Sequence, residues 1–200
     1  MSQLKLTADS GGGTVAIKGP ASTTGNAALD LTVPGTASAT LDTLGRAGNI
    51  LQVKQTVKLD TFTTTSTTAV DVTGLSVAIT PTSSSSKILV TVCMAFGTDD
   101  ANFSYGVLKR GSTQIGEASG ANNRIRPTFM VYNSQNEGIV EHLNFTFLDS
   151  PNTTSETTYK MQVQCASTGT ATVGRSFRDT DNVANDPRCS STITVMEVAA

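Results

Sequence analysis

The side chains that could carry acid–base or nucleophilic chemistry are few and widely separated. The chain has one histidine, His142, and no Gly-x-Ser-x-Gly motif accompanies it. A catalytic triad needs an activated serine and an orienting acid beside such a base. Glu137, Glu141, Asp149 and Glu156 could supply the paired carboxylates of a glycan-cleaving enzyme, but solvated surface charge explains them equally well. We therefore expect no enzymatic activity and no catalytic residue.

Two short segments are rich in the oxygen ligands that Ca²⁺ prefers. They are Thr98–Asn102 and Asp179–Asp186. The second segment breaks the EF-hand pattern at Val183 and lacks its glycine and distal glutamate, and a polar loop with Asx-turns has the same composition. The sequence predicts no metal site and no cofactor, and leaves open whether one of these loops binds Ca²⁺.

Charge and composition limit the classes of partner. Only 15% of the 200 residues are charged and the formal net charge is -2, so we expect no binding to nucleic acid or to a membrane. No window approaches 18 apolar residues, and Met1–Leu6 lacks the apolar core of a secretory signal, which predicts folding in a cytosol. Three widely spaced cysteines without a C-x-x-C motif fit two small core residues and a loop thiol: Cys93, Cys165 and Cys189.

The elements that must position any site differ between the two parts of the chain. Residues 1–61 contain no aromatic side chain, and their short apolar pieces alternate with period two, as strands do. One chain could not bury enough area here, at about 25 cal/mol per Å², to offset an ordering cost of about 1–2 kcal/mol per residue. We predict a β-prism-like stalk in which three copies share one core, with a flexible linker as the alternative. The predicted stalk core is Val15, Ile17, Leu29, Leu31, Val33, Leu41 and Leu44.

The segment Thr43–Gln55 is the predicted joint between stalk and head. Its two glycines, Gly45 and Gly48, permit a tight change of backbone direction. We assign residues 1–48 to an attachment segment and stalk, and residues 49–200 to the head. Ile50 and Leu51 would begin the head core, and the next strand carries apolar positions at 51, 53, 57, 59 and 62.

The head is predicted to be all-β. Its apolar runs give about ten strands and no helix, with turns about every 8–15 residues, which favours an antiparallel sandwich and most simply a jelly roll. The strand Lys87–Phe96 is apolar on both faces, which predicts a central place in a sheet that packs on both sides. One face carries Ile88, Val90, Val92, Met94 and Phe96, and the other carries Leu89, Cys93 and Ala95.

Several motifs together resemble the short structural proteins and fibre tips of marine bacteriophages, especially phages of cyanobacteria. They are residues 11–15 (GGGTV), 29–35 (LDLTVPG), 44–53 (LGRAGNILQV), 70–75 (VDVTGL), 79–90 (ITPTSSSSKILV), 147–151 (FLDSP), 158–160 (TYK) and 193–197 (ITVME). The strand order of the head, with residues 107–115 and a last strand at the C-terminus, is similar to the trimeric jelly roll of the complement C1q and tumour-necrosis-factor type.

The resemblance implies a homotrimeric tail fibre or spike that is part of a virion and is assembled in the host cytoplasm. Its N-terminus would dock on other virion proteins, and its head would bind a glycan or protein of the host surface. Only about ten residues precede Gly11, which leaves little room for a large adaptor domain. A capsid decoration or cement protein is therefore the alternative, and a glycan-cleaving tailspike is a third.

Receptor contacts are expected on loops at the end of the head far from the stalk, because loops on a rigid scaffold commonly carry function. The candidate loops are Asp99–Phe103, Ser119–Arg126 and Arg175–Arg188. Side chains that could stack on sugars or hydrogen-bond to them are Tyr105, Asn122, Asn123, Arg124 and Arg178.

Overall fold

The computed structural model describes residues 46–99, 102–120, 122–133 and 137–200. Residues 1–45 of the predicted attachment segment and stalk, including the seven core residues, lie outside these ranges. Within them every regular element is a strand, and no helix could cross a membrane. The strands are β1 (Ile50–Lys58), β2 (Phe62–Thr64), β3 (Val70–Ile79), β4 (Lys87–Thr98), β5 (Asn102–Arg110), β6 (Thr113–Gln114), β7 (Phe129–Asn133), β8 (Glu141–Asp149), β9 (Thr157–Cys165), β10 (Ala171–Val173) and β11 (Ser191–Val198).

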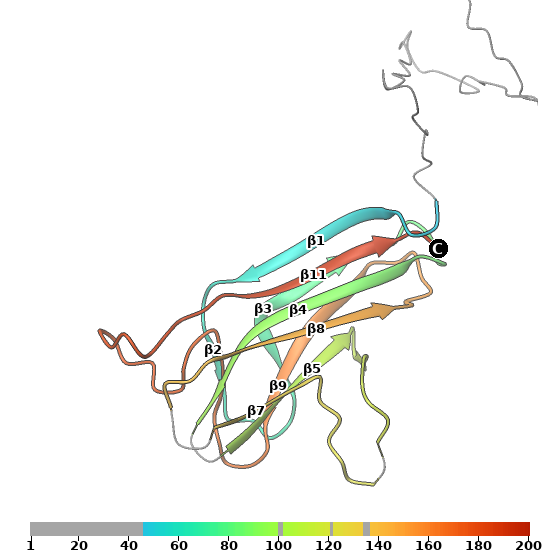
Figure 1. Ribbon diagram of the computed structural model, residues 1–200. Helices are drawn as coiled ribbons and strands as arrows, with labels where there is room; N and C mark the ends of the chain where they lie inside the picture. The colour runs from blue at the N-terminus through green and yellow to red at the C-terminus, as the bar shows by residue number, and fades with distance from the viewer. Residues whose placement is uncertain (1–45, 100–101, 121, 134–136) are drawn as a thin grey trace, which may run out of the picture. The chain divides into compact units, whose positions relative to one another are not determined.

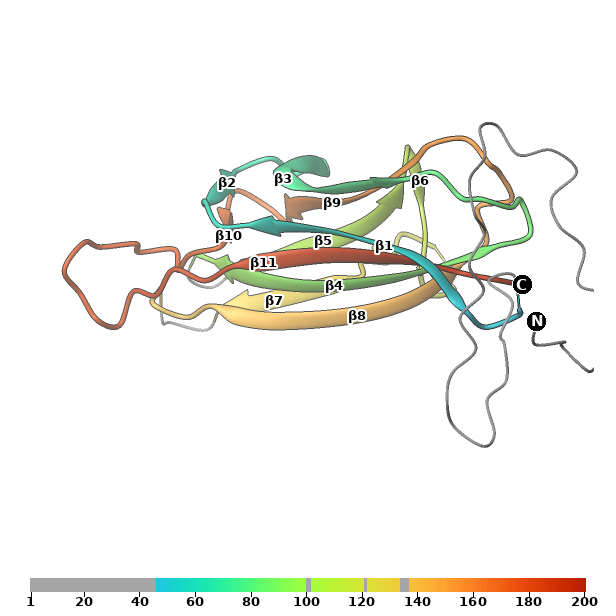
Figure 2. The same ribbon diagram turned by 90° about the horizontal axis from the view of Figure 1, so that it is seen from above.

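The strands form two antiparallel sheets that face each other (Figures 1 and 2). In sheet 1 the long strands lie in the order β1-β11-β4-β8. Beyond the end of β11, the short strand β10 takes its place beside the last residues of β4, and β2 pairs with the other edge of β10. In sheet 2 the order is β3-β9-β5-β7, with β6 on the other half of β5. The prediction of an all-β antiparallel sandwich is confirmed.

The connectivity is that of a jelly roll. Counting only the eight longer strands in chain order, sheet 1 holds the first, eighth, third and sixth, and sheet 2 holds the second, seventh, fourth and fifth. Apart from β5 and β7, which follow one another, neighbours within each sheet are therefore distant in sequence, as in two interleaved Greek keys. This order brings the last strand, β11, between β1 and β4.

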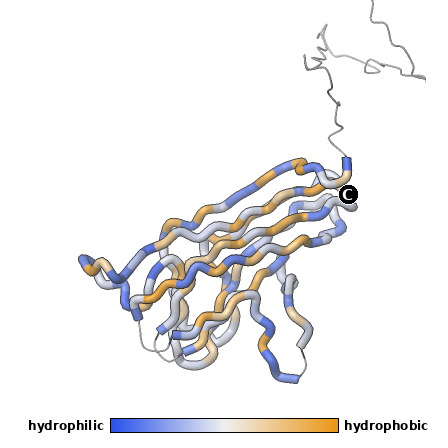
Figure 3. The backbone as a smooth tube through the Cα atoms, viewed as in Figure 1, coloured by the Kyte–Doolittle hydropathy of each residue, from blue (hydrophilic) through white to orange (hydrophobic). Residues whose placement is uncertain are grey.

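The core between the sheets forms because the apolar residues of each strand recur with period two. The inner residues of β4, from Ile88 to Phe96, are all fully buried, which confirms the face predicted for this strand. Ile193 and Val195 of β11 lie beside this row in sheet 1, and Met161 and Val163 of β9 face it from sheet 2. Figure 3 shows that apolar stretches follow the strands of both sheets.

The orientation of β1 is the reverse of the prediction. Ile50, Val53, Val57 and Leu59 are 47%, 53%, 47% and 81% exposed, whereas Lys58 is buried. A register shift between Ile50 and Gln52, and the pairing with β11, turn Gln52 and Lys58 inward. Ile50 therefore does not begin the head core as expected. Polar partners satisfy these inward groups: the Lys58 ammonium donates to the Thr73 carbonyl at 2.8 Å and to Asp60 at 2.9 Å.

The two ends of the sandwich differ in what they carry. At one end, called the terminal end here, Gly48 (φ +88°) donates its backbone N–H to the Ala199 carbonyl at 2.8 Å. The Ala199 N–H in turn donates to the Asn49 carbonyl at 2.9 Å. The opposite end carries the β4–β5, β7–β8 and β10–β11 connections (Figure 1). The predicted loop Ser119–Arg126 does not belong to that end. It leaves sheet 2 after β6, close to the terminal end, and rejoins it at β7.

Glu197 is a fully buried carboxylate that forms no ion pair among the described residues. It points inward from β11 and accepts hydrogen bonds from the Gln52 amide at 2.6 Å and from the backbone N–H and hydroxyl of Thr82, each at 2.7 Å. Burial alone would raise its pKa, but these donors favour the charged form and lower the pKa to about 2. Glu197 thereby ties the β3–β4 connection to β1 and β11.

We expect Glu197→Gln to lower the free energy of unfolding by about 1–3 kcal/mol at pH 7. The NH2 group of the new amide would face the Gln52 and Thr82 donors, which now bind the carboxylate oxygens. A carboxylate with a lowered native pKa contributes its stability above the unfolded pKa, and that contribution is lost as the pH falls from about 4.5 towards 2. The urea midpoints of the two proteins should therefore differ most at pH 7 and by clearly less at pH 2.5. The exposed Glu156→Gln is the control, and a gap that stays constant with pH would contradict the assignment.

Candidate subunit interface

The side of sheet 1 that faces away from sheet 2 is covered by no described part of the chain over most of its area. We call it the outer face and define it by outward side chains of the four long strands. Its residues are Val53, Gln55 and Val57 of β1, Thr192, Thr194, Met196 and Val198 of β11, Leu89, Thr91 and Cys93 of β4, and His142, Asn144, Thr146 and Leu148 of β8.

The outer face carries an apolar row that crosses all four strands. Val53 is the register partner of Met196, Met196 of Leu89, and Leu89 of Leu148. The two ends of this row, Val53 and Leu148, are 53% and 52% exposed. Paired residues of neighbouring strands point to the same side of a sheet. The four side chains therefore form one continuous hydrophobic strip, which we call the apolar row.

The next row is polar but satisfies itself. It consists of Gln55, Thr194, Thr91 and Thr146 in register. The Gln55 amide donates to the Thr194 hydroxyl at 2.8 Å, and the hydroxyls of Thr91 and Thr146 lie 3.4 Å apart. Polar groups that already hold hydrogen bonds within the chain lose less when water is removed. This row can therefore be covered by a partner at low cost.

Charge separates the outer face from its counterpart on sheet 2. The residues that define the outer face include no Asp, Glu, Lys or Arg, and Lys87 stands only at its terminal margin, where its ammonium donates to the Ser150 hydroxyl at 2.8 Å. The outward side of sheet 2 carries Asp71 and Lys160, which pair at 2.7 Å, and Lys109. Depletion of charge around an apolar centre is the compositional mark of a protein interface.

The predicted packing on both sides of β4 is met within the described chain only near the end of the strand, where Ala95 is fully buried. Leu89 and Cys93 lie on the outer face and are partly exposed. His142 stands beside Cys93, with 3.9 Å between its Nδ1 and the cysteine sulfur. No cluster of three or more His, Cys, Asp or Glu that could hold a metal occurs among the described residues. The surroundings of His142 are therefore those of a partly exposed sheet surface.

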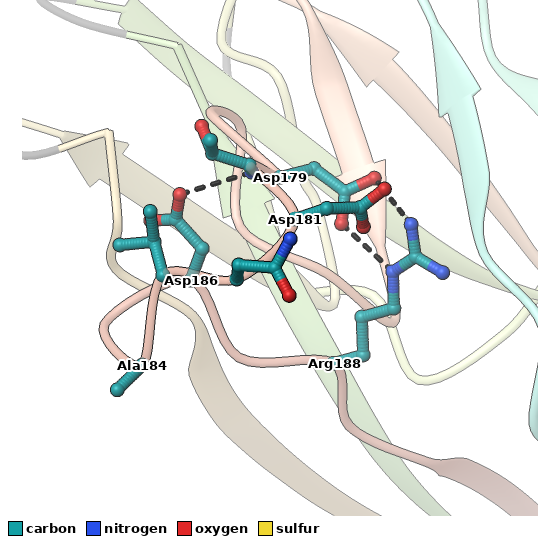
Figure 4. Close-up of a pocket in the computed structure, with 8 residues that line it drawn as sticks. Asp179, Asp181, Ala184, Asp186 and Arg188 are labelled. Atoms are coloured by element: carbon teal, nitrogen blue, oxygen red, sulfur yellow. Dashed lines mark hydrogen bonds and ion pairs between the residues drawn. The ribbon is translucent and has the colours of Figure 1, made fainter.

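The β10–β11 loop at the opposite end is held by ion pairs. Arg178 binds Asp186 through two nitrogens at 2.6 and 2.9 Å. Arg188 binds Asp179 at 2.8 and 2.9 Å (Figure 4). These guanidinium groups lower the pKa of Asp186 to about 2 and lower that of Asp179 as well. Asp179 also lies 3.4 Å from Arg175. Arginine side chains therefore already pair with Asp179 and Asp186, two of the carboxylates that were candidate Ca²⁺ ligands.

The residues predicted to contact a receptor do not form one group. Tyr105 points outward from the middle of β5 in sheet 2, and its register partners are Met130 and Gln164. Asn122, Asn123 and Arg124 are exposed in the β6–β7 connection, and Asn122 has a positive φ of 60°. Arg178 belongs to the loop at the opposite end, where its guanidinium holds Asp186.

The outer face was not identified as a site from the sequence. The one available signal was the strand Lys87–Phe96, whose two apolar faces predicted packing on both sides. Which residues of β1, β8 and β11 share the second face depends on register, and register is fixed by long-range pairing.

Comparison with known proteins adds little. No protein-family model matches the chain, and neither does any curated protein. One similar solved chain comes from the structure of the infectious bursal disease virus Gx strain, with a TM-score of 0.38 and 14% identity over 86% of this chain and 41% of that chain. This chain thus spans about two fifths of the length of that one. A likeness of this size supports no statement about function.

Proposed function

We propose that the chain is a non-enzymatic structural protein of a phage virion, and that it assembles as a homotrimer in which the outer face of each head packs against a neighbouring copy. The apolar row Val53–Met196–Leu89–Leu148 is the observation that carries the proposed assembly through the outer face. Fully burying an aliphatic side chain contributes about 1.5–3 kcal/mol. Removing this row from water in three copies would therefore supply a substantial driving force for association.

A second copy of the chain suits the outer face better than a charged partner does. The residues of the face carry no formal charge, so identical copies can approach without repulsion. The polar row beside the apolar one is already hydrogen-bonded. An interface with a dry centre and satisfied polar groups is the arrangement that oligomers use.

The virion role and the number of copies come from the sequence. The aromatic-free first part of the chain needs a shared core, and the motifs quoted above resemble phage appendage proteins. The jelly-roll strand order agrees with the fold expected from that resemblance. In this proposal the N-terminal part docks on other virion proteins, and the loops or sheet surfaces of the head contact a glycan or protein of the host surface.

Locating the protein on virions tests the role directly. Antibodies against the head, attached to gold particles and viewed by electron microscopy, should mark the tail of the phage. Label on the capsid faces would instead make the chain a decoration protein. An absence of label, from virions whose other components are detected, would contradict a virion role altogether.

A further inference from the structure

A second exposed cluster of large side chains lies on the outward side of sheet 2. Phe103 and Tyr132 are register partners on β5 and β7, their ring centroids are 4.4 Å apart, and they are 40% and 45% exposed. Met130, which is 53% exposed, is the register partner of Tyr105 on the same two strands. Gln164 of β9 lies on the other side of Tyr105. We call these five side chains the aromatic patch.

The size of the aromatic patch argues against a protein partner. Phe103, Met130 and Tyr132 are each about half exposed, which leaves together about 300 Å² if each side chain offers about 200 Å². A stable interface between proteins needs about 800 Å² from each partner. The patch is therefore too small for a second copy of the chain, but it is large enough for a short stretch of sugar rings.

The chemistry of the patch suits a neutral ligand. None of its five members is charged. The charges on the same side of sheet 2 lie outside the patch: Lys160 and Asp71 are paired with each other at 2.7 Å, and Lys109 stands four positions from Tyr105 along β5. Among the described residues, the hydroxyls of Tyr105 and Tyr132 and the Gln164 amide form no side-chain hydrogen bond. The rings thus present apolar surface, while three polar groups beside them remain available to donate and accept hydrogen bonds.

We propose that the aromatic patch binds a neutral glycan. The C–H faces of the sugar rings would lie on Phe103 and Tyr132, and the sugar hydroxyls would exchange hydrogen bonds with Tyr105 and Gln164. An acidic glycan would need a cation at the contact, and the patch supplies none. The inference rests on the proposed surface-contact role of the head, and it places that contact on the side of sheet 2 rather than on the β10–β11 loop.

Affinity electrophoresis of the full chain tests this site. Native gels containing soluble glucan, mannan or galactan supply the neutral polysaccharides, and a gel containing polygalacturonate supplies the acidic comparison. At least one neutral gel should retard the protein. Tyr132→Ala and Gln164→Ala should each raise the dissociation constant at least tenfold. Thr158→Ala, on the same side of sheet 2 but outside the patch, should migrate like the wild type.

Three results would overturn the inference: no retardation in any of the neutral gels, retardation by polygalacturonate alone, or patch variants that bind like the wild type. Urea midpoints show whether each variant is folded, and the mild Gln164→Ala change guards against loss of fold in Tyr132→Ala. Light scattering on the same samples separates the two proposals. Trimers without retardation would remove the glycan site alone, whereas retarded monomers would remove the assembly alone.

Discussion

Leu148→Arg is expected to make the trimer dissociate at concentrations more than about a thousandfold higher than the wild type does, because each trimer carries three substituted faces. Leu148 ends the apolar row on β8 and is 52% exposed in the single chain, so arginine fits the isolated head without strain. Packed against a neighbouring copy, the guanidinium would be buried without a partner, which costs about 3–5 kcal/mol. Each 1.4 kcal/mol is about a tenfold change in an equilibrium constant. Light scattering over a dilution series measures the shift.

Met130→Arg is the matched control for this prediction. Met130 is also a large apolar residue on an outward sheet surface, with 53% exposure, but it lies on sheet 2. Its replacement should leave the dissociation midpoint unchanged. If both variants dissociate alike, general surface hydrophobicity explains the association. If Leu148→Arg leaves the midpoint where it was, the outer face is not the contact.

Asp149→Ala should lower the free energy of unfolding by about 3–5 kcal/mol. Asp149 is a buried carboxylate at the end of β8, and it joins the two sheets. It accepts hydrogen bonds from Arg110 of β5 at 2.9 Å to each oxygen, and from the Tyr159 hydroxyl of β9 at 2.7 Å. Tyr159 is fully buried, and that burial, together with the carboxylate, raises its pKa. Removing the carboxylate leaves a guanidinium and a buried hydroxyl without their acceptor.

Urea denaturation at pH 7 measures this loss. Asp71→Ala is the comparison, because the Asp71–Lys160 pair is as short, at 2.7 Å, but exposed. An exposed pair contributes at most about 1 kcal/mol. Since small domains are stable by only about 5–15 kcal/mol, Asp149→Ala should bring the head close to unfolding at moderate urea. Equal losses in the two variants would show that Asp149 is not a link between the sheets.

How far the sequence predicts the fold differs from strand to strand. In β4 the inner face from Ile88 to Phe96 follows from period two alone, because every inward position is apolar. In β1 the same rule fails, since Val53 and Val57 point outward while Lys58 points inward. A lysine whose ammonium reaches Asp60 and a backbone carbonyl can occupy an inward position. Alternation along a strand shows which residues share a face. Whether that face points into the core depends on the strand pairing and on the hydrogen-bond partners available to its side chains.

The candidate site was less predictable than the fold. The apolar row draws one residue from each of four strands that are up to about 145 positions apart, and only the jelly-roll pairing brings Val53, Leu89 and Met196 into line. Tyr105 was a candidate from its residue type, but its neighbours Phe103 and Tyr132 complete the aromatic patch only through the pairing of β5 and β7. Loops were favoured on general grounds, whereas both candidate surfaces lie on sheets.

The most direct test of this account is the mass in solution of the full, unmodified chain, measured by light scattering or native mass spectrometry at micromolar concentration. The outer face predicts self-association, and the aromatic-free first part of the chain predicts three copies, so we expect a single species with three times the mass of one chain. A stable, folded monomer would contradict both, because the apolar row would then stay in water with no partner.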